Sequence, residues 1–230
     1  GGFMLAFLGR ETSLLTVAVL LAICFILINL LQKRSFPKIE STNLAESLGE
    51  GFRFIWKTKI VLWAISLDIV SVLFGGVIAL LQIFAEDILK IGPEGLGYLR
   101  AAPSIGALIT MLALTKFPRT QHAWRNMLLA VAGFGVFTLL FAFSNHIALS
   151  LFALAMTGAC DSISVVIRQT ILQLYPPENM RGRIAAVNGM FVSSSNELGA
   201  FESGLAAKYF GTIMATVLGG GITLAVVVVS

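Results

Sequence analysis

Long runs of apolar residues, rather than short periodic stripes, dominate this chain of 230 residues. Many of the runs reach about 18 residues, enough for an α-helix to cross the hydrocarbon core of a bilayer. Strands are not expected, because an open sheet edge in lipid would leave backbone groups unpaired and barrel strands would alternate over about 10 residues. We therefore predict an all-α membrane protein with seven spanning helices, near residues 14–31, 60–82, 96–114, 127–143, 147–174, 184–208 and 212–229.

Composition supports the same class. Hydrophobic residues make up 57% of the chain and charged residues only 12%, about half the charged share of an ordinary soluble domain. The net charge of +4 is not gathered on one arm or face, so a nucleic-acid partner is not expected. Cys24 and Cys160 each lie inside an apolar run without metal-ligand spacing, and we interpret both as small core residues.

The basic residues alternate between the predicted loops. Cytoplasmic loops of membrane proteins hold an excess of Lys and Arg, so this alternation sets the orientation. The longest loop of the other set carries Glu86, Asp87 and Glu94 and is expected to face outward. Eleven of the 16 basic residues fall in the loops assigned to the cytoplasm: Lys33, Arg34, Lys38, Arg53, Lys57, Lys59, Lys116, Arg119, Arg125, Arg181 and Arg183.

One long polar segment divides the chain. Residues 33–59 are predicted to form a cytoplasmic linker with an amphipathic helix that begins near Leu44, where Asn43 and Glu46 have the spacing of a capping box. Residues 1–32 then hold the end of one bundle, a helix tail plus one full span, and residues 60–230 a six-helix bundle. The N-terminal residues lack the charged region of a signal peptide, and we expect the chain to be part of a longer protein.

Specific segments resemble a known family. The fifth and sixth spans contain GACDSISVVIRQTILQLYPPENMRGRIAAVNGMF and SSSNELGAFESGLAAKYFG, and LDIVSVLFGG and GPEGLGYLRAAPSIGAL occur in and after the second span. These segments look like the major facilitator superfamily, and more narrowly its enterobactin-exporter-like branch of bacterial drug and siderophore exporters. The resemblance covers essentially the whole chain.

The resemblance implies a fold of two six-helix bundles, with this chain holding the C-terminal bundle and the last span of the N-terminal one. It also implies a multi-pass protein of the cell inner membrane, with a small-molecule substrate, protons and the missing N-terminal bundle as partners. Arg181 and Arg183, in the RGR of the fifth loop, are then expected to belong to a cytoplasmic gating loop.

Ionisable residues inside a span are costly in lipid and are functional candidates by default. Asp68 lies about 12 Å from the cytoplasmic end of the second span, near mid-bilayer. Burial disfavours a charged carboxylate, so Asp68 is the first candidate for proton coupling. The alternative is a carboxylate that only packs helices together through a hydrogen bond.

Asp161 and Arg168 are seven residues apart on one face of the fifth span, roughly 10 Å along the axis, so each is expected to find a partner on another helix. Asp68, Glu197 and Glu202 are the obvious partners for Arg168. The alternative for Arg168 is snorkelling to the cytoplasmic interface. For Asp161, structural pairing and a role in transport remain open.

The remaining candidates lie nearer the outer side. Glu197 and Glu202 point about 140° apart around the sixth span, so only one can face a central cavity; we expect Glu197 to face the cavity and Glu202 to pack or gate. Arg100 begins the third span, where interfacial anchoring is the alternative to a transport role. Glycines within spans favour close helix packing, and would also allow helices to bend: Gly75, Gly76, Gly106, Gly133, Gly135, Gly199 and Gly204.

Nothing in the sequence indicates an enzyme. The chain has no P-loop, HExxH, nucleophile elbow or His cluster, so no catalytic residue, metal or cofactor is expected. Without an ATP-binding motif, an ion gradient is the expected energy source. We predict a proton-coupled antiporter that exports small molecules, and a chain that does not transport alone because most of one bundle is missing. A facilitator or importer of the same fold, or a non-transporting subunit that binds a partner through the linker, remain alternatives.

Overall fold

The computed structural model describes residues 2–30, 44–116 and 122–229, with the backbone alone for residues 2–10, 44 and 45. Every regular element in these residues is a helix, as the apolar runs predict. The chain divides into two compact units, Gly1–Asn43 and Leu44–Ser230, which are described separately. The predicted cap at Asn43 lies outside the described residues.

The first unit contains one long helix, α1 (Gly2–Leu30). From Glu11 onward it is apolar enough to cross a membrane, and nearly all its described side chains are exposed within its unit. Phe25 and Leu30, for example, are 70% and 73% exposed. In water this helix would be unstable alone, so its partner is lipid or another part of the protein.

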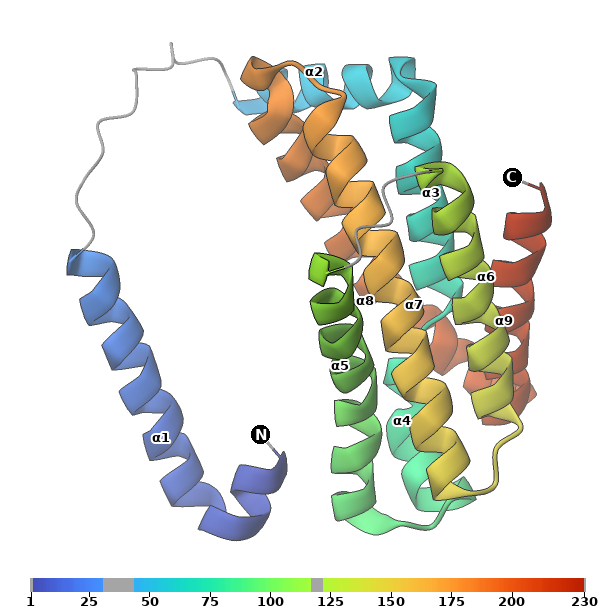
Figure 1. Cartoon of the computed structure of the whole chain (residues 1–230). Coiled ribbons are helices and arrows are strands. Elements are labelled where there is room, and N and C mark those ends of the chain that lie inside the picture. Colours follow the sequence, from blue (N-terminus) through green and yellow to red (C-terminus); the bar gives the residue numbers. More distant parts are fainter. Residues whose placement is uncertain (1, 31–43, 117–121, 230) are drawn as a thin grey trace. The chain divides into compact units, whose positions relative to one another are not determined.

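The second unit is a helical bundle. Its spans are α3 (Lys59–Phe74) with α4 (Val77–Ile83) and a π-helical turn (Phe84–Ile88), then α5 (Gly92–Lys116), α6 (Ala123–Ala142), α7 (Ile147–Leu174), α8 (Arg181–Phe210) and α9 (Thr212–Val229). The amphipathic helix α2 (Leu44–Lys57) begins where the sequence predicts and lies across one end of the bundle (Figure 1). A 3-10 turn (Glu178–Met180) precedes α8.

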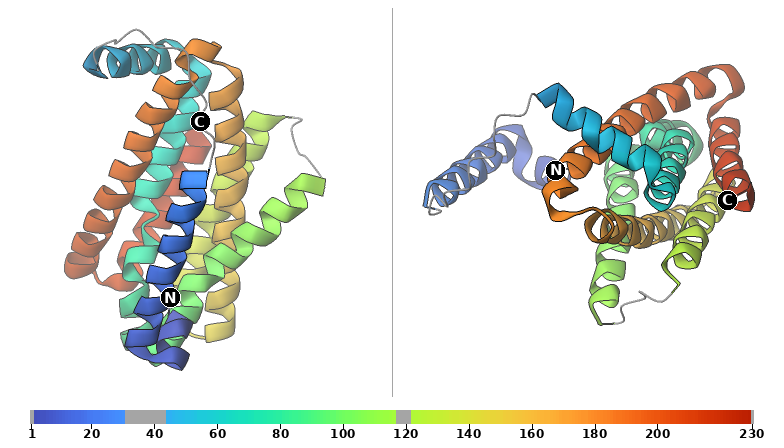
Figure 2. Two further views of the ribbon diagram at one scale, coloured as in Figure 1. Left: turned by 90° about the vertical axis from the view of Figure 1, so that its left-hand side faces the viewer. Right: turned by 90° about the horizontal axis from the view of Figure 1, so that it is seen from above.

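Most basic residues of the bundle gather at one end, as expected from the loops, while Lys90 and Lys208 lie at the other. One end of the bundle, called here the basic end, carries α2 and Lys59, Lys116, Arg125 and Arg181 (Figure 2). The other end carries Glu86, Asp87 and Glu94. This arrangement is the one that the positive-inside rule requires for a basic end in the cytoplasm.

Helices occur at all seven predicted spans. Among the described residues, six of these seven spans are both long and apolar enough to cross a membrane. The exception is α8, which has 30 residues and ample length but a much more polar composition. Arg183, Glu197 and Glu202 contribute to that polarity. A polar helix among apolar ones is favoured only where it faces protein or water.

The second span is interrupted at Gly75 and Gly76, where the N–H of Val77 donates to the carbonyl of Gly75, 2.6 Å away, instead of to the residue four positions back. Neighbouring helices approach the break so closely that a β-carbon at Gly76 would meet the carbonyl of Gly199 and the Ser203 hydroxyl. A β-carbon at Gly219 would likewise meet the carbonyl of Phe74. The glycines predicted to allow close packing of spans therefore do so, except Gly204, where a β-carbon would meet nothing within 4 Å.

Candidate functional site

A buried ion pair joins α3 to α7 in the interior of the bundle. Arg168 Nη1 contacts Asp68 Oδ1, and the two side chains are only 4% and 5% exposed. Asp68 is one of the three partners expected for Arg168. The snorkelling alternative is wrong for this structure, because the guanidinium turns inward to the carboxylate rather than to the interface.

The pair leaves part of the guanidinium unsatisfied. Arg168 Nε is buried and has no hydrogen-bond acceptor among the described residues. A buried arginine normally uses most of its five donors, so this geometry leaves room for another acceptor. Such an acceptor would be a water, or a carboxylate that moves towards the arginine.

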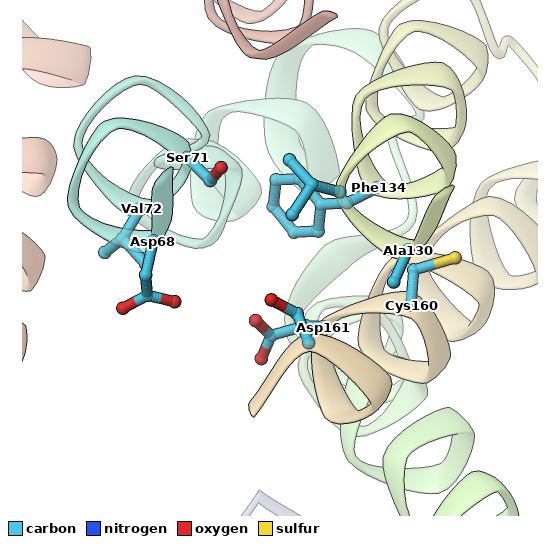
Figure 3. Close-up of a pocket in the computed structure, with 9 residues that line it drawn as sticks. Asp68, Ser71, Val72, Ala130, Phe134, Cys160 and Asp161 are labelled. Carbon is cyan, nitrogen blue, oxygen red and sulfur yellow. The ribbon is translucent and has the colours of Figure 1, made fainter. Parts of the chain in front are cut away.

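A second carboxylate shares the space beside the pair. Asp68 and Asp161 line one small pocket, with Asp68 on α3 and Asp161 on α7 projecting into the gap between the helices (Figure 3). Phe134 of α6 closes one side of this pocket, and Cys160 lies next to Asp161. Asp161 precedes Arg168 by two turns on α7, and the ion pair that Arg168 forms among the described residues is with Asp68 rather than with Asp161.

Two serine hydroxyls also line the pocket, together with the apolar residues Val72, Ala130 and Val131. Ser71, one turn after Asp68, contributes a hydroxyl that donates to the carbonyl of Leu67 at 2.7 Å. Ser164 lies one turn from both Asp161 and Arg168 and is also buried. Neither serine was predicted, although the spacing of three or four residues from a membrane-buried charge is a usable signal.

The pocket is small. Its volume of about 20 Å³ has room for a water molecule but not for an organic substrate. A pocket of this size, lined by two carboxylates of which one is paired with a guanidinium, is suited to protons and water. An organic ligand of the protein would have to bind elsewhere.

The other candidates do not join this site. Glu197 is exposed on α8, Glu202 is half-buried on the same helix, and Arg100 is exposed on α5. Gly199 packs on α3, where a β-carbon would lie 2.8 Å from the carbonyl of Val72. Glu197 is roughly opposite Gly199 on the helix, so it faces away from α3.

The two loop arginines have different surroundings. Arg183 pairs with Glu50 and so ties α8 to the amphipathic helix α2. Arg181 Nη1 is 3.8 Å from Glu178 Oε1, an exposed contact within the same turn. The sequence did not indicate the role of Glu50, which is one of several acidic residues in the linker.

No group of three or more His, Cys, Asp or Glu that could hold a metal occurs among the described residues. The candidate site is therefore a cluster of charged side chains, Asp68, Arg168 and Asp161, on membrane-spanning helices of the bundle.

Sequence comparison identifies the family, since residues 1–200 match the Major Facilitator Superfamily. The chain belongs to the major facilitator superfamily. This superfamily comprises transporters and not enzymes, and its helical bundles account for the fold. The multidrug efflux pump Tap of Mycolicibacterium fortuitum is similar, with 26% identity over 217 residues.

That similarity covers 89% of this chain but 51% of the Tap sequence. The chain therefore spans about half the length of its curated relative in this superfamily. No solved structure matches it.

Proposed function

We propose that this chain is the C-terminal half of a proton-coupled exporter of small molecules in a bacterial inner membrane. In this proposal residues 60–230 form the C-terminal bundle, residues 33–59 the linker and residues 1–32 the end of an N-terminal bundle. Membership of the superfamily supports it, and so does similarity to a protein named as a multidrug efflux pump. The substrates would be drugs or siderophore-like compounds of the enterobactin-exporter-like branch.

The observation that carries the proposal is the ion pair between Asp68 and Arg168, beside a second carboxylate. Asp68 and Arg168 are buried, whereas Asp161 at the pocket is exposed within this unit. Buried charges are costly unless they are paired, so we infer that one arginine neutralises one of the two carboxylates at a time. A proton on Asp68 would free Arg168 to turn towards Asp161, and loss of that proton would restore the first pair. This exchange would give α3 and α7 two arrangements that differ by one proton.

Such an exchange can drive transport if the two arrangements favour different orientations of the bundles. Superfamily transporters move substrate by rocking two bundles around a site near the midplane. Because the pocket at Asp68 is too small for substrate, we place the substrate between the bundles, against the exposed face of α8. That face contains Glu197, Met190 and Phe201.

The remaining candidates take supporting roles in this proposal. Glu202, half-buried beside the face of α8 that packs on α4, would pack or gate, and Arg100 would anchor α5 at the interface. Arg183 would restrain the basic end through its contact with α2.

The test is proton-gradient-dependent efflux of a fluorescent amphiphile by the full-length protein, comparing wild type with Asp68→Asn and Asp161→Asn. We expect both variants to lose gradient-dependent efflux while still reaching the membrane. Asp87→Asn is the matched control, because Asp87 is an exposed carboxylate at the opposite end of the bundle. Normal efflux by Asp68→Asn would reduce the pair to a packing contact.

The same assay separates the alternatives. Flux that continues down the substrate gradient without a proton gradient would identify a facilitator, and net uptake an importer. No flux in the wild type, together with capture of a partner through residues 33–59, would favour a non-transporting subunit.

A further inference from the structure

An apolar pocket unrelated to the charge cluster opens at the basic end of the bundle. It lies between the start of α3, the end of α5, the start of α6 and the end of α7, and has a volume of about 320 Å³. Figure 2 shows α5 diverging from α6 and α7 towards the basic end, where the pocket lies. Its walls include Ile60, Leu114, Trp124, Ile163, Val166 and Leu174.

The lining favours a hydrocarbon ligand. Among the described residues that line it, the polar groups are those of Thr170, Tyr175, the Trp124 indole and the backbone. The volume falls in the range of about 300–1,000 Å³ typical of small-molecule sites. Since the pocket lies between membrane spans, the molecules that reach it in greatest number are the acyl chains of the surrounding lipid.

Three cations lie at the ends of the helices that form this pocket. Lys59 precedes the lining residue Ile60, Arg125 follows Trp124, and Lys116 lies two positions after Leu114. All three cations are exposed, and none forms an ion pair with any residue that the structure describes.

In the described part of the chain, no carboxylate at this end of the bundle forms an ion pair with these three cations, although Glu46 of α2 is exposed there. At the same end of the bundle, Glu50 pairs with Arg183, and Glu178 lies beside Arg181. The three cations are therefore free to bind an anion from the membrane surface.

We propose that this pocket binds an anionic phospholipid of the leaflet at the basic end, with an acyl chain against Trp124 and the phosphate near Lys59, Lys116 and Arg125. Basic pockets between spans on the cytoplasmic side are suited to anionic headgroups, and each nearby cation strengthens binding by about fivefold. The proposal is independent of transport, since it needs only the pocket, the cations and a bilayer. It assigns a second, structural ligand to the bundle.

The test uses Trp124 as a built-in probe. In the full-length protein every other tryptophan, including Trp56 and Trp63 of this chain, is replaced by Phe. The protein is placed in mixed vesicles of phosphatidylglycerol and phosphatidylcholine, with bromine on the acyl chains of one lipid at a time. Brominated phosphatidylglycerol is expected to quench Trp124 more strongly at equal mole fraction.

Removal of the three cations should abolish the stronger quenching of Trp124 by brominated phosphatidylglycerol. Each of Lys59→Gln, Lys116→Gln and Arg125→Gln is expected to lower the preference by up to about fivefold, and the triple variant to abolish it. Arg53→Gln is the matched control, since Arg53 is an exposed cation on α2, a helix that contributes no residue to the pocket lining, and it should keep the preference.

Three results would overturn the proposal. The first is equal quenching by both lipids, which indicates ordinary annular contact. The second is a preference that survives the triple variant. The third is displacement of both lipids alike by a drug-like amphiphile, which assigns the pocket to substrate. Native mass spectrometry of the unmodified protein gives an independent readout, because retained phosphatidylglycerol should be lost in the triple variant only.

Discussion

Glu50 of α2 is paired with Arg183 at the start of α8, so the amphipathic helix is attached to the bundle by a charge contact as well as by apolar packing. Phe52 adds to this attachment, with its ring centroid 5.8 Å from that of Phe191. Gly51 allows the close approach, because a β-carbon there would lie 3.2 Å from the carbonyl of Arg183.

Breaking this contact should loosen α2 without unfolding the bundle. Arg183→Gln is expected to cost about 1 kcal/mol or less, as partly exposed pairs do, and to raise hydrogen exchange in residues 44–57. The reversed pair Glu50→Arg with Arg183→Glu should restore protection. Arg181→Gln serves as the control because Arg181 contacts only its own turn, and equal exchange in both variants would refute a restraining role for Arg183.

The buried ion pair between Asp68 and Arg168 predicts that the effects of the two single substitutions on stability are strongly non-additive. Asp68→Leu or Arg168→Met alone should destabilise the protein by about 3–5 kcal/mol, because each leaves an unpaired charge in the interior. The double variant should recover much of that loss, since neither member of the pair is left without its partner. Thermal unfolding in detergent would measure the cycle, and additive single effects would show that the two side chains do not interact.

The crossing of α5 and α7 depends on two glycines. A β-carbon at Gly106 would collide with the carbonyl of Ala155, and one at Gly158 with the carbonyl of Pro103. Gly106→Ala should therefore destabilise the bundle by about 1–3 kcal/mol through forced separation of the helices. Gly97→Ala on the same helix meets nothing within 4 Å and should be tolerated, which thermal unfolding of the two variants can check side by side.

The orientation of the bundle across the membrane can be measured directly. In a background without cysteine, Glu178→Cys at the basic end should react with an impermeant maleimide only after the cells are opened. Glu94→Cys at the other end should react in intact cells. The opposite pattern would show that the positive-inside assignment is wrong for this protein.

Much of the fold was predictable because lipid imposes a long apolar run on each span. The start of α2 near Leu44 was predictable because its amphipathic pattern follows a polar segment. The break at Gly75 and Gly76 was not, since two glycines within a span are equally typical of tight packing. The sequence is also ambiguous for α8, because its length is that of a membrane span while its composition is more polar than that of the other spans.

The candidate site was predictable only in part. Asp68 and Arg168 stand out as charges within apolar runs, but their pairing depends on how α3 and α7 are rotated against each other. No local pattern encodes that rotation. Glu50 was harder still, because a carboxylate in a polar linker has no unusual neighbours in the sequence.

The interrupted second span takes part in two separate cores. Val61 and Leu67 on α3 belong to the apolar cluster near the basic end, whereas Val77 and Phe84, beyond the break, belong to the cluster near the opposite end. Because the hydrogen-bond ladder is interrupted between them, a tilt of one segment need not strain the other. The break thus divides the span into two rigid segments, each fixed in its own apolar cluster, and makes Gly75 and Gly76 the positions at which a change of angle between the two ends of the bundle would break the fewest backbone hydrogen bonds.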